Sequence, residues 1–105
     1  RAGHAYDAVV VTNYLWRERL ADIAAAVGAG GVLIYETFAI GNELLGKPSN
    51  PLFLLRRGEL LDLARASGLT VLGFESGRVD LPRPAIIERI CAWRATASAT
   101  PPAID

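Results

Sequence analysis

The sequence contains few of the residues that form disulfides and metal sites. Its 105 residues include one cysteine, Cys91, one histidine, His4, and no methionine. A single cysteine cannot form an internal disulfide, and one cysteine with one histidine cannot supply a structural zinc cluster. We therefore expect no metal site, a surface role for His4 and a small core residue at Cys91. Because no initiator methionine precedes Arg1, we also expect a piece of a longer protein.

The sequence also lacks net charge and long apolar runs. Eleven basic and eleven acidic residues cancel, so no overall field attracts nucleic acid or anionic lipid. No stretch approaches the roughly twenty apolar residues that cross a bilayer, and no secretory signal opens the chain. With 51% hydrophobic and 21% charged residues, the chain is too apolar for a disordered protein. We expect a cytoplasmic domain with neither nucleic acid nor membrane as its partner.

The first half of the chain has the pattern of a strand, a helix and a second strand. Residues 7–12 form a β-branched run without polar alternation, which is typical of a parallel strand covered on both faces. Apolar residues at helical spacing predict an amphipathic helix over residues 16–27, with Gly28 as its C-cap. Residues 32–38 then form a second apolar run, which predicts a second buried strand.

The second half begins with an irregular segment. Residues 39–55 are rich in turn formers and have little periodicity, so we expect a lid-like loop that contains one helical turn. The remaining elements are predicted in chain order: a helix over 57–67 that stops at Gly68, a strand over 69–75, an antiparallel strand over 85–93 and a flexible tail over 96–105. These elements together predict an α/β domain.

The ends of the first two strands are the expected place for a ligand. Open parallel sheets bind ligands beyond the carboxyl ends of their strands, which selects residues 12–16 and 36–38 on one shared rim. Glu36 lies near the end of an otherwise apolar strand, where a carboxylate without a partner is costly. The sequence leaves two interpretations of Glu36 open: a catalytic base or substrate-orienting group, and a structural acceptor for the following loop.

Three segments of the sequence form an ordered set: Tyr-Asp-Ala-Val-Val-Val-Thr-Asn-Tyr-Leu-Trp-Arg at 6–17, Gly-Gly-Val-Leu-Ile-Tyr-Glu-Thr-Phe at 30–38, and Asn-Pro-Leu-Phe-Leu-Leu-Arg-Arg-Gly-Glu-Leu at 50–60. This set resembles the C-terminal half of class I S-adenosylmethionine-dependent methyltransferases, with most likeness to the tellurite-resistance-like and general bacterial methyltransferase-domain group. The resemblance implies that residues 1–95 form the C-terminal part of a Rossmann-like methyltransferase fold. It implies a mostly parallel sheet whose antiparallel last strand is inserted beside the second strand.

The resemblance also implies a site and its ligands. The cofactor would be S-adenosylmethionine and the acceptor a small molecule. Thr12 and Asn13 would lie near the cofactor, and Glu36 would be the catalytic residue. The substrate would be bound by Tyr14, Trp16, Thr37 and Phe38. Aromatic faces among these residues suit a cationic methyl donor, although aromatic side chains at strand ends also serve simply for packing.

One feature of the resembled family is absent from the sequence. An acidic residue followed by a Gly-x-Gly-x-Gly loop normally joins a strand to a helix, whereas the glycines at 28–31 follow a helix and enter a strand. We therefore expect this chain to lack the main cofactor-binding loop. Two other functions stay open: a non-catalytic α/β half-domain that assembles with a partner subunit, and another nucleotide-binding α/β enzyme. Without a neighbour, the strand at 7–12 is expected to self-associate through its open edge.

Overall fold

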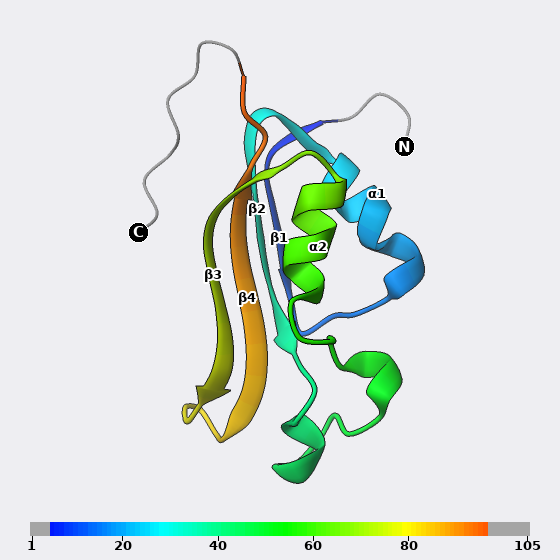
Figure 1. The fold of residues 1–105 in the computed structure, drawn as a ribbon, viewed down its shortest axis with the longest axis vertical. Helices are drawn as coiled ribbons and strands as arrows, with labels where there is room; N and C mark the ends of the chain where they lie inside the picture. The colour runs from blue at the N-terminus through cyan, green and yellow to red at the C-terminus, as the bar shows by residue number, and fades with distance from the viewer. Residues whose placement is uncertain (1–4, 97–105) are drawn as a thin grey trace.

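The computed structural model describes residues 5–96 and contains a four-stranded sheet with the strand order β1-β2-β4-β3 (Figure 1). The strands are β1 (Tyr6–Thr12), β2 (Val27–Phe38), β3 (Thr70–Val79) and β4 (Ala85–Trp93). The helices are α1 (Leu20–Ala25) and α2 (Glu59–Ala66). His4 and residues 97–105 of the predicted tail lie outside the described residues.

The directions of the strands confirm part of the predicted topology and correct another part. β1 pairs with β2 in parallel, with Thr12 opposite Glu36. β4 is inserted between β2 and β3 and is antiparallel to both, as the resemblance implied. The prediction of a mostly parallel sheet is wrong, because this insertion turns two of the three neighbouring pairs antiparallel.

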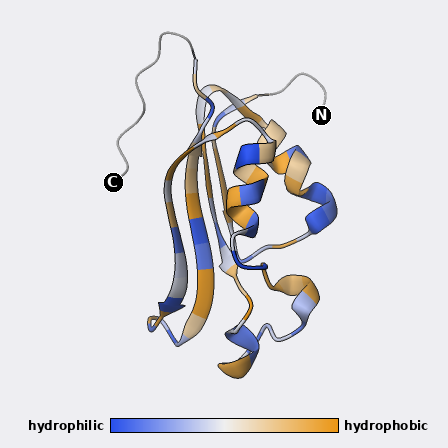
Figure 2. Cartoon of the chain, viewed as in Figure 1, coloured by the Kyte–Doolittle hydropathy of each residue, from blue (hydrophilic) through white to orange (hydrophobic). Residues whose placement is uncertain are grey.

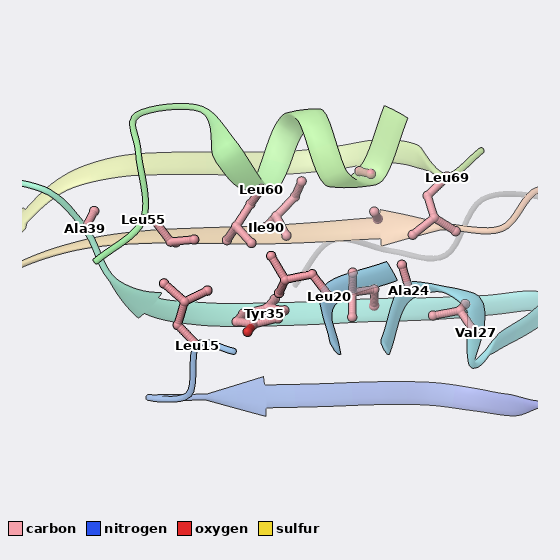
Figure 3. Close-up of a cluster of buried hydrophobic side chains, with 13 residues drawn as sticks. Leu15, Leu20, Ala24, Val27, Tyr35, Ala39, Leu55, Leu60, Leu69 and Ile90 are labelled. Carbon is pink, nitrogen blue, oxygen red and sulfur yellow. The ribbon is translucent and has the colours of Figure 1, made fainter. Parts of the chain in front are cut away.

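Both helices lie against one face of the sheet, and the core lies between them and the strands (Figures 1 and 3). Leu33 and Tyr35 of β2 are fully buried there, together with Leu60 and Ala64 of α2. No helix among residues 5–96 covers the opposite face, which we call the bare face. On it, Val10 is 62% exposed and Ile34 is 43% exposed. The prediction that residues 7–12 are covered on both faces is therefore wrong, because among residues 5–96 β1 is an edge strand covered by helices on one face only.

The predicted helix over residues 16–27 is shorter than expected. A 3-10 turn at Arg17–Arg19 precedes α1, and β2 already begins at Val27. Gly28 is not a C-cap but part of β2, where β1 passes very close. A Cβ atom at Gly28 would lie 2.9 Å from the Cβ of Ala5, and one at Gly31 would lie 2.7 Å from the carbonyl oxygen of Tyr6. These glycines allow two backbones to approach each other rather than end a helix.

The later elements agree more closely with the sequence. α2 ends where expected, and Gly68 has the positive φ of 74° that suits a helix stop. β4 has the predicted bounds, while β3 extends four residues beyond the predicted end at residue 75. Arg94 follows β4 and contacts carbonyls at the C-terminal ends of both helices and at the start of β2. Its guanidinium donates to the carbonyl oxygens of Ala24 and Val27 at 3.0 and 2.7 Å and to that of Ser67 at 3.2 Å.

The segment 39–55 contains two 3-10 turns, Asn42–Leu44 and Pro51–Phe53, rather than the single turn expected. It is closed at its base, where Leu55 donates its N–H to the carbonyl of Phe38 and accepts from Ile40, both at 2.9 Å. Asn42 is buried and fixes the segment from inside. Its amide donates to the carbonyl of Pro48 at 2.9 Å and accepts from the N–H of Ile86 at 3.0 Å. The segment is thus anchored to both β2 and β4.

We propose that residues 1–105 by themselves self-associate through β1, because its outer edge has no neighbouring strand among the described residues. Exposed apolar edges pair readily, and a lysine on the edge is a common means of preventing this. We expect Val10→Lys to lower the apparent mass of the concentrated protein in light scattering. Leu81→Lys, at a still more exposed apolar residue in the β3–β4 turn, is the control and should change nothing. A monomeric wild type over the whole concentration range would contradict the proposal.

Candidate functional site

A pocket of about 640 Å³ opens where β1 and β2 end. We call it the rim pocket. Its lining comes from the segment after β1, the end of β2 and the loop between β2 and α2: Asn13, Tyr14, Leu15, Trp16, Thr37, Phe38, Pro48 and Phe53. Four of these eight side chains are aromatic, and the polar ones are few, which is the usual character of a small-molecule site.

The segment after β1 is fixed by hydrogen bonds to β2. Asn13 has a φ of 56°, which is uncommon for a residue other than glycine, and its N–H donates to the carbonyl of Glu36 at 2.9 Å. The Tyr35 hydroxyl reaches through the core and donates to the carbonyl of Tyr14 at 2.6 Å. Burial, reinforced by Tyr14 and Glu59, raises the pKa of Tyr35 to about 12, so this hydroxyl stays a donor at neutral pH. Tyr35 therefore positions one wall of the pocket.

The opposite wall is held by an ion pair between Arg17 and Glu59. Nε and Nη2 of Arg17 donate to the two Glu59 carboxylate oxygens at 2.8 and 2.9 Å. The same guanidinium donates to the carbonyls of Leu52 and Leu54 at 3.1 and 2.7 Å, on either side of Phe53. One arginine thus connects the segment after β1, the loop that carries Phe53 and the start of α2.

The environment of Glu59 favours its charged form. Burial alone would raise the pKa of this carboxyl, but the hydrogen bonds from the Arg17 side chain and the Arg56 N–H outweigh burial and lower the pKa. The pKa of Arg17 is raised, chiefly by the hydrogen bond to Glu59. Both partners are therefore charged at neutral pH, and they form a charge-assisted bidentate contact.

The structure brings together five residues that the sequence selected. Asn13, Tyr14, Trp16, Thr37 and Phe38 all line the rim pocket. Their shared location was expected from the parallel strand ends, and the register of β1 with β2 produces it. Thr12 is exposed and does not line the pocket, because it lies opposite Glu36 and its side chain, like that of Val10, points to the bare face.

Glu36 lies apart from these residues. Its side chain is 39% exposed, and its Oε1 lies 3.3 Å from Nε of Arg89, which also contacts Glu75 at 3.4 Å. The carboxylate therefore has the partner that the sequence led us to expect, but the premise that it is buried is wrong. Adjacent residues of a strand point to opposite faces, so Thr37 points toward the helices and the rim pocket while Glu36 points to the bare face. The catalytic role of Glu36 stays a prediction that requires its own test.

Trp16 contacts two charged side chains. The guanidinium of Arg19 lies 5.1 Å from the centre of its ring, and its Nε1–H donates to Glu18 at 2.7 Å. This ring therefore accepts a cation on one face in the structure itself, as expected for an electron-rich indole.

Leu15 lies within the selected range 12–16, but the sequence did not indicate two lining residues, Pro48 and Phe53, or the two positioning residues, Tyr35 and Arg17. The Asn-Pro-Leu-Phe stretch at 50–53 was a usable signal, because Asn50 accepts from the N–H of Leu52 and so builds the turn that carries Phe53.

Cys91 lies beside Glu36 and Arg89 on the bare face, where burial raises the pKa of its thiol. Among residues 5–96 no cluster of potential metal ligands and no membrane-spanning helix is present.

Solved structures with the same fold are S-adenosylmethionine-dependent methyltransferases and related proteins. A SAM-dependent methyltransferase from Methanosarcina mazei matches 90% of this chain with a TM-score of 0.64 and 13% identity, and the match spans 63% of its own length. A variant of the 16S rRNA (adenine(1408)-N(1))-methyltransferase from Catenulisporales acidiphilia matches 91% with a TM-score of 0.58 and 14% identity, over 54% of its length. A protein of echinomycin biosynthesis that converts a disulfide bond into a thioacetal group matches equally well, at 13% identity and over 52% of its length.

These matches show the fold of the chain and how much of each matched protein it covers. The chain has the fold of part of a class I methyltransferase domain and spans between about half and two thirds of the matched proteins. No protein-family model and no curated sequence matches the chain.

The ion pair of Arg17 with Glu59 makes stability depend on pH. Because folding lowers the pKa of Glu59, the stabilisation is complete above the ordinary carboxyl pKa of 4.5 and is lost as the pH falls through the lower folded value. We expect Glu59→Gln to lower the free energy of unfolding at pH 7 by about 2 kcal/mol and to flatten its decline below pH 4.5, measured by urea titration. Glu75→Gln, at an exposed carboxylate, is the control. Equal acid profiles for Glu59→Gln and the wild type would contradict this account.

Proposed function

We propose that this chain is the acceptor-binding part of an S-adenosylmethionine-dependent methyltransferase that acts on a small molecule. The observation that carries the proposal is the rim pocket, an aromatic pocket at the ends of two parallel strands in a partial methyltransferase fold. Matched proteins from this fold class act with the same cofactor, and one of them was crystallised with it.

The residues of the rim pocket suit the reactive end of this cofactor. When bound, S-adenosylmethionine supplies an electrophilic methyl group on a positively charged sulfur. Tyr14, Trp16 and Phe38 offer the aromatic faces that stabilise such a cation and exclude water from it. Of the described residues, none that lines the pocket is acidic, so this lining lacks the carboxylate that commonly holds a cofactor's ribose hydroxyls. The pocket thus fits the methyl donor's charged end rather than its nucleoside.

Two polar side chains are available to orient an acceptor. Thr37 is almost fully buried on the helix-covered face of β2, and Asn13 stands at the turn after β1. A hydroxyl and an amide both donate and accept hydrogen bonds, so together they fix the direction of a polar acceptor without carrying charge. Alignment of the reacting groups is the main contribution that a protein makes to an in-line displacement.

The size and charge of the chain favour a small acceptor over a nucleic acid. Its basic and acidic residues are equal in number, whereas proteins that bind nucleic acid concentrate basic residues along one surface. A pocket of about 640 Å³ lies within the range that binds small organic molecules. We therefore assign a small-molecule acceptor, although one matched protein methylates rRNA.

The proposal is tested by measuring kcat/KM for transfer of a labelled methyl group from S-adenosylmethionine, with the complete protein that contains this chain. Trp16→Leu and Phe38→Leu keep the pocket apolar but remove its aromatic faces, and each should lower kcat/KM by about tenfold. Tyr6→Leu replaces an exposed aromatic residue at the opposite end of β1 and should leave kcat/KM unchanged. Activity that is insensitive to both pocket variants would overturn the assignment of the rim pocket.

The same assay tests the role of Glu36. Because its carboxylate points to the bare face and pairs with Arg89, we expect Glu36→Gln to leave the pH profile of kcat/KM unchanged. Loss of the acidic limb of that profile in Glu36→Gln would instead support Glu36 as the catalytic base.

A second function is favoured by the bare face and the open edge of β1. Both features suit a non-catalytic half-domain that completes a partner subunit. This function predicts that the complete protein binds no S-adenosylmethionine in calorimetry, whereas the proposed methyltransferase releases or absorbs heat in that titration.

A further inference from the structure

A second pocket, of about 350 Å³, lies between the end of β3 and the loop that follows β2. We call it the β3 pocket. Its lining includes Gly41, Leu44, Arg57, Ser76, Arg78 and Glu88, and it shares no residue with the rim pocket. Apolar side chains of the loop contribute to its lining, together with polar groups from β3, β4 and the segment just before α2.

Glu88 is the unusual group in this lining. Figure 2 shows a hydrophilic band across the otherwise hydrophobic β4, where the sequence reads Ile-Glu-Arg-Ile. Arg89 in this band faces the bare side, but Glu88 points toward the helices and is 0% exposed. Its Oε2 accepts from the Gly58 N–H at 2.8 Å and from the Ser76 hydroxyl at 3.1 Å.

The other carboxylate oxygen of Glu88 has no hydrogen-bond donor among the described residues. A buried polar atom without a partner costs free energy comparable to that of a lost hydrogen bond, and more when the group is charged. Ser76, which contacts the same carboxylate, is exposed and lines the pocket, so the carboxylate lies directly behind the pocket wall. A ligand that donates a hydrogen bond from this pocket would satisfy the free oxygen.

Two arginines give the outer part of the pocket the opposite charge. Arg57 forms no ion pair with any residue between 5 and 96, although the neighbouring Arg56 lies 3.7 Å from Glu59. Arg78 contacts Asp80 at 2.8 Å through Nε, which leaves the other N–H groups of its guanidinium for a ligand. The pocket therefore has an acidic floor and a basic margin.

We propose that the β3 pocket binds a small molecule that carries both an ammonium group and an anionic group. The ammonium donates to the free oxygen of Glu88, and a carboxylate or phosphate of the same molecule pairs with Arg57 and Arg78. An arginine fork recognises either anion, and three N–H donors let an ammonium meet both Glu88 and the Ser76 hydroxyl. The proposal does not depend on methyl transfer.

The test is an NMR titration of ¹⁵N-labelled protein with 4-aminobutyrate and with phosphoethanolamine, which separate the two anion sources. We expect the amides of Gly58, Ser76 and Glu88 to shift with one or both probes, while amides of the rim pocket do not. N-acetylation of the probe removes its ammonium and should weaken binding at least about tenfold in the unchanged protein.

Three variants assign the contacts. Glu88→Gln keeps an acceptor for Gly58 but removes the charge, and it should weaken both probes at least about tenfold. Arg57→Gln should weaken the binding of 4-aminobutyrate and phosphoethanolamine. It should not change the binding of n-butylamine, which has an ammonium group but no anionic group. Glu75→Gln, on the adjacent strand but at an exposed side chain, is the matched control. Absence of shifts at millimolar probe, or equal binding by the N-acetylated probe, would overturn the proposal.

Discussion

The parallel register that sets Thr12 beside Glu36 determines where this chain is able to bind a ligand. Because both strands run in one direction, the residues that follow β1 and those that end β2 emerge at the same edge. This register requires β1 and β2 to lie very close together at Gly28 and Gly31. A residue with a Cβ atom at either position would collide with the backbone or side chain of the β1 segment. A shift of this pairing by one residue would turn the side chains of β1 to the other face and separate the two walls of the rim pocket.

Hydrogen bonds from Arg17 and Tyr35 fix the segments that the strands do not position. The loop between β2 and α2 has little regular structure, yet Phe53 has a definite place because Arg17 donates to the carbonyls of Leu52 and Leu54 as well as to Glu59. Tyr35 performs the same task for the segment after β1. Both groups act from the helix-covered side, whereas the ion pairs of Arg89 with Glu36 and Glu75 lie on the bare face. The two faces of the sheet thus differ. The helix-covered face carries the groups that form the pocket, and the bare face has no covering layer within residues 5–96.

Strand ends were easier to predict than strand faces. The alternating pattern at residues 85–93 located β4 with its bounds, and the rule for parallel strands selected segments that contribute six of the eight residues lining the rim pocket. Glu36 was placed incorrectly because burial was inferred from apolar neighbours, although the order Leu33, Tyr35, Thr37 already puts Glu36 on the other face. Gly28 was misread because close contact between two strands and the end of a helix both select glycine. Arg17, Tyr35 and Glu88 act through partners distant in the sequence, which no local pattern indicates.

The central claim is that the ends of β1 and β2 form the ligand site. Hydrogen–deuterium exchange of the complete protein, with and without S-adenosylhomocysteine, tests it most directly because exchange reports binding without catalysis. The account predicts slower exchange at residues 13–16 and 37–38, together with the loop around Phe53. Binding that leaves these segments unchanged and protects only other parts of the chain would contradict it.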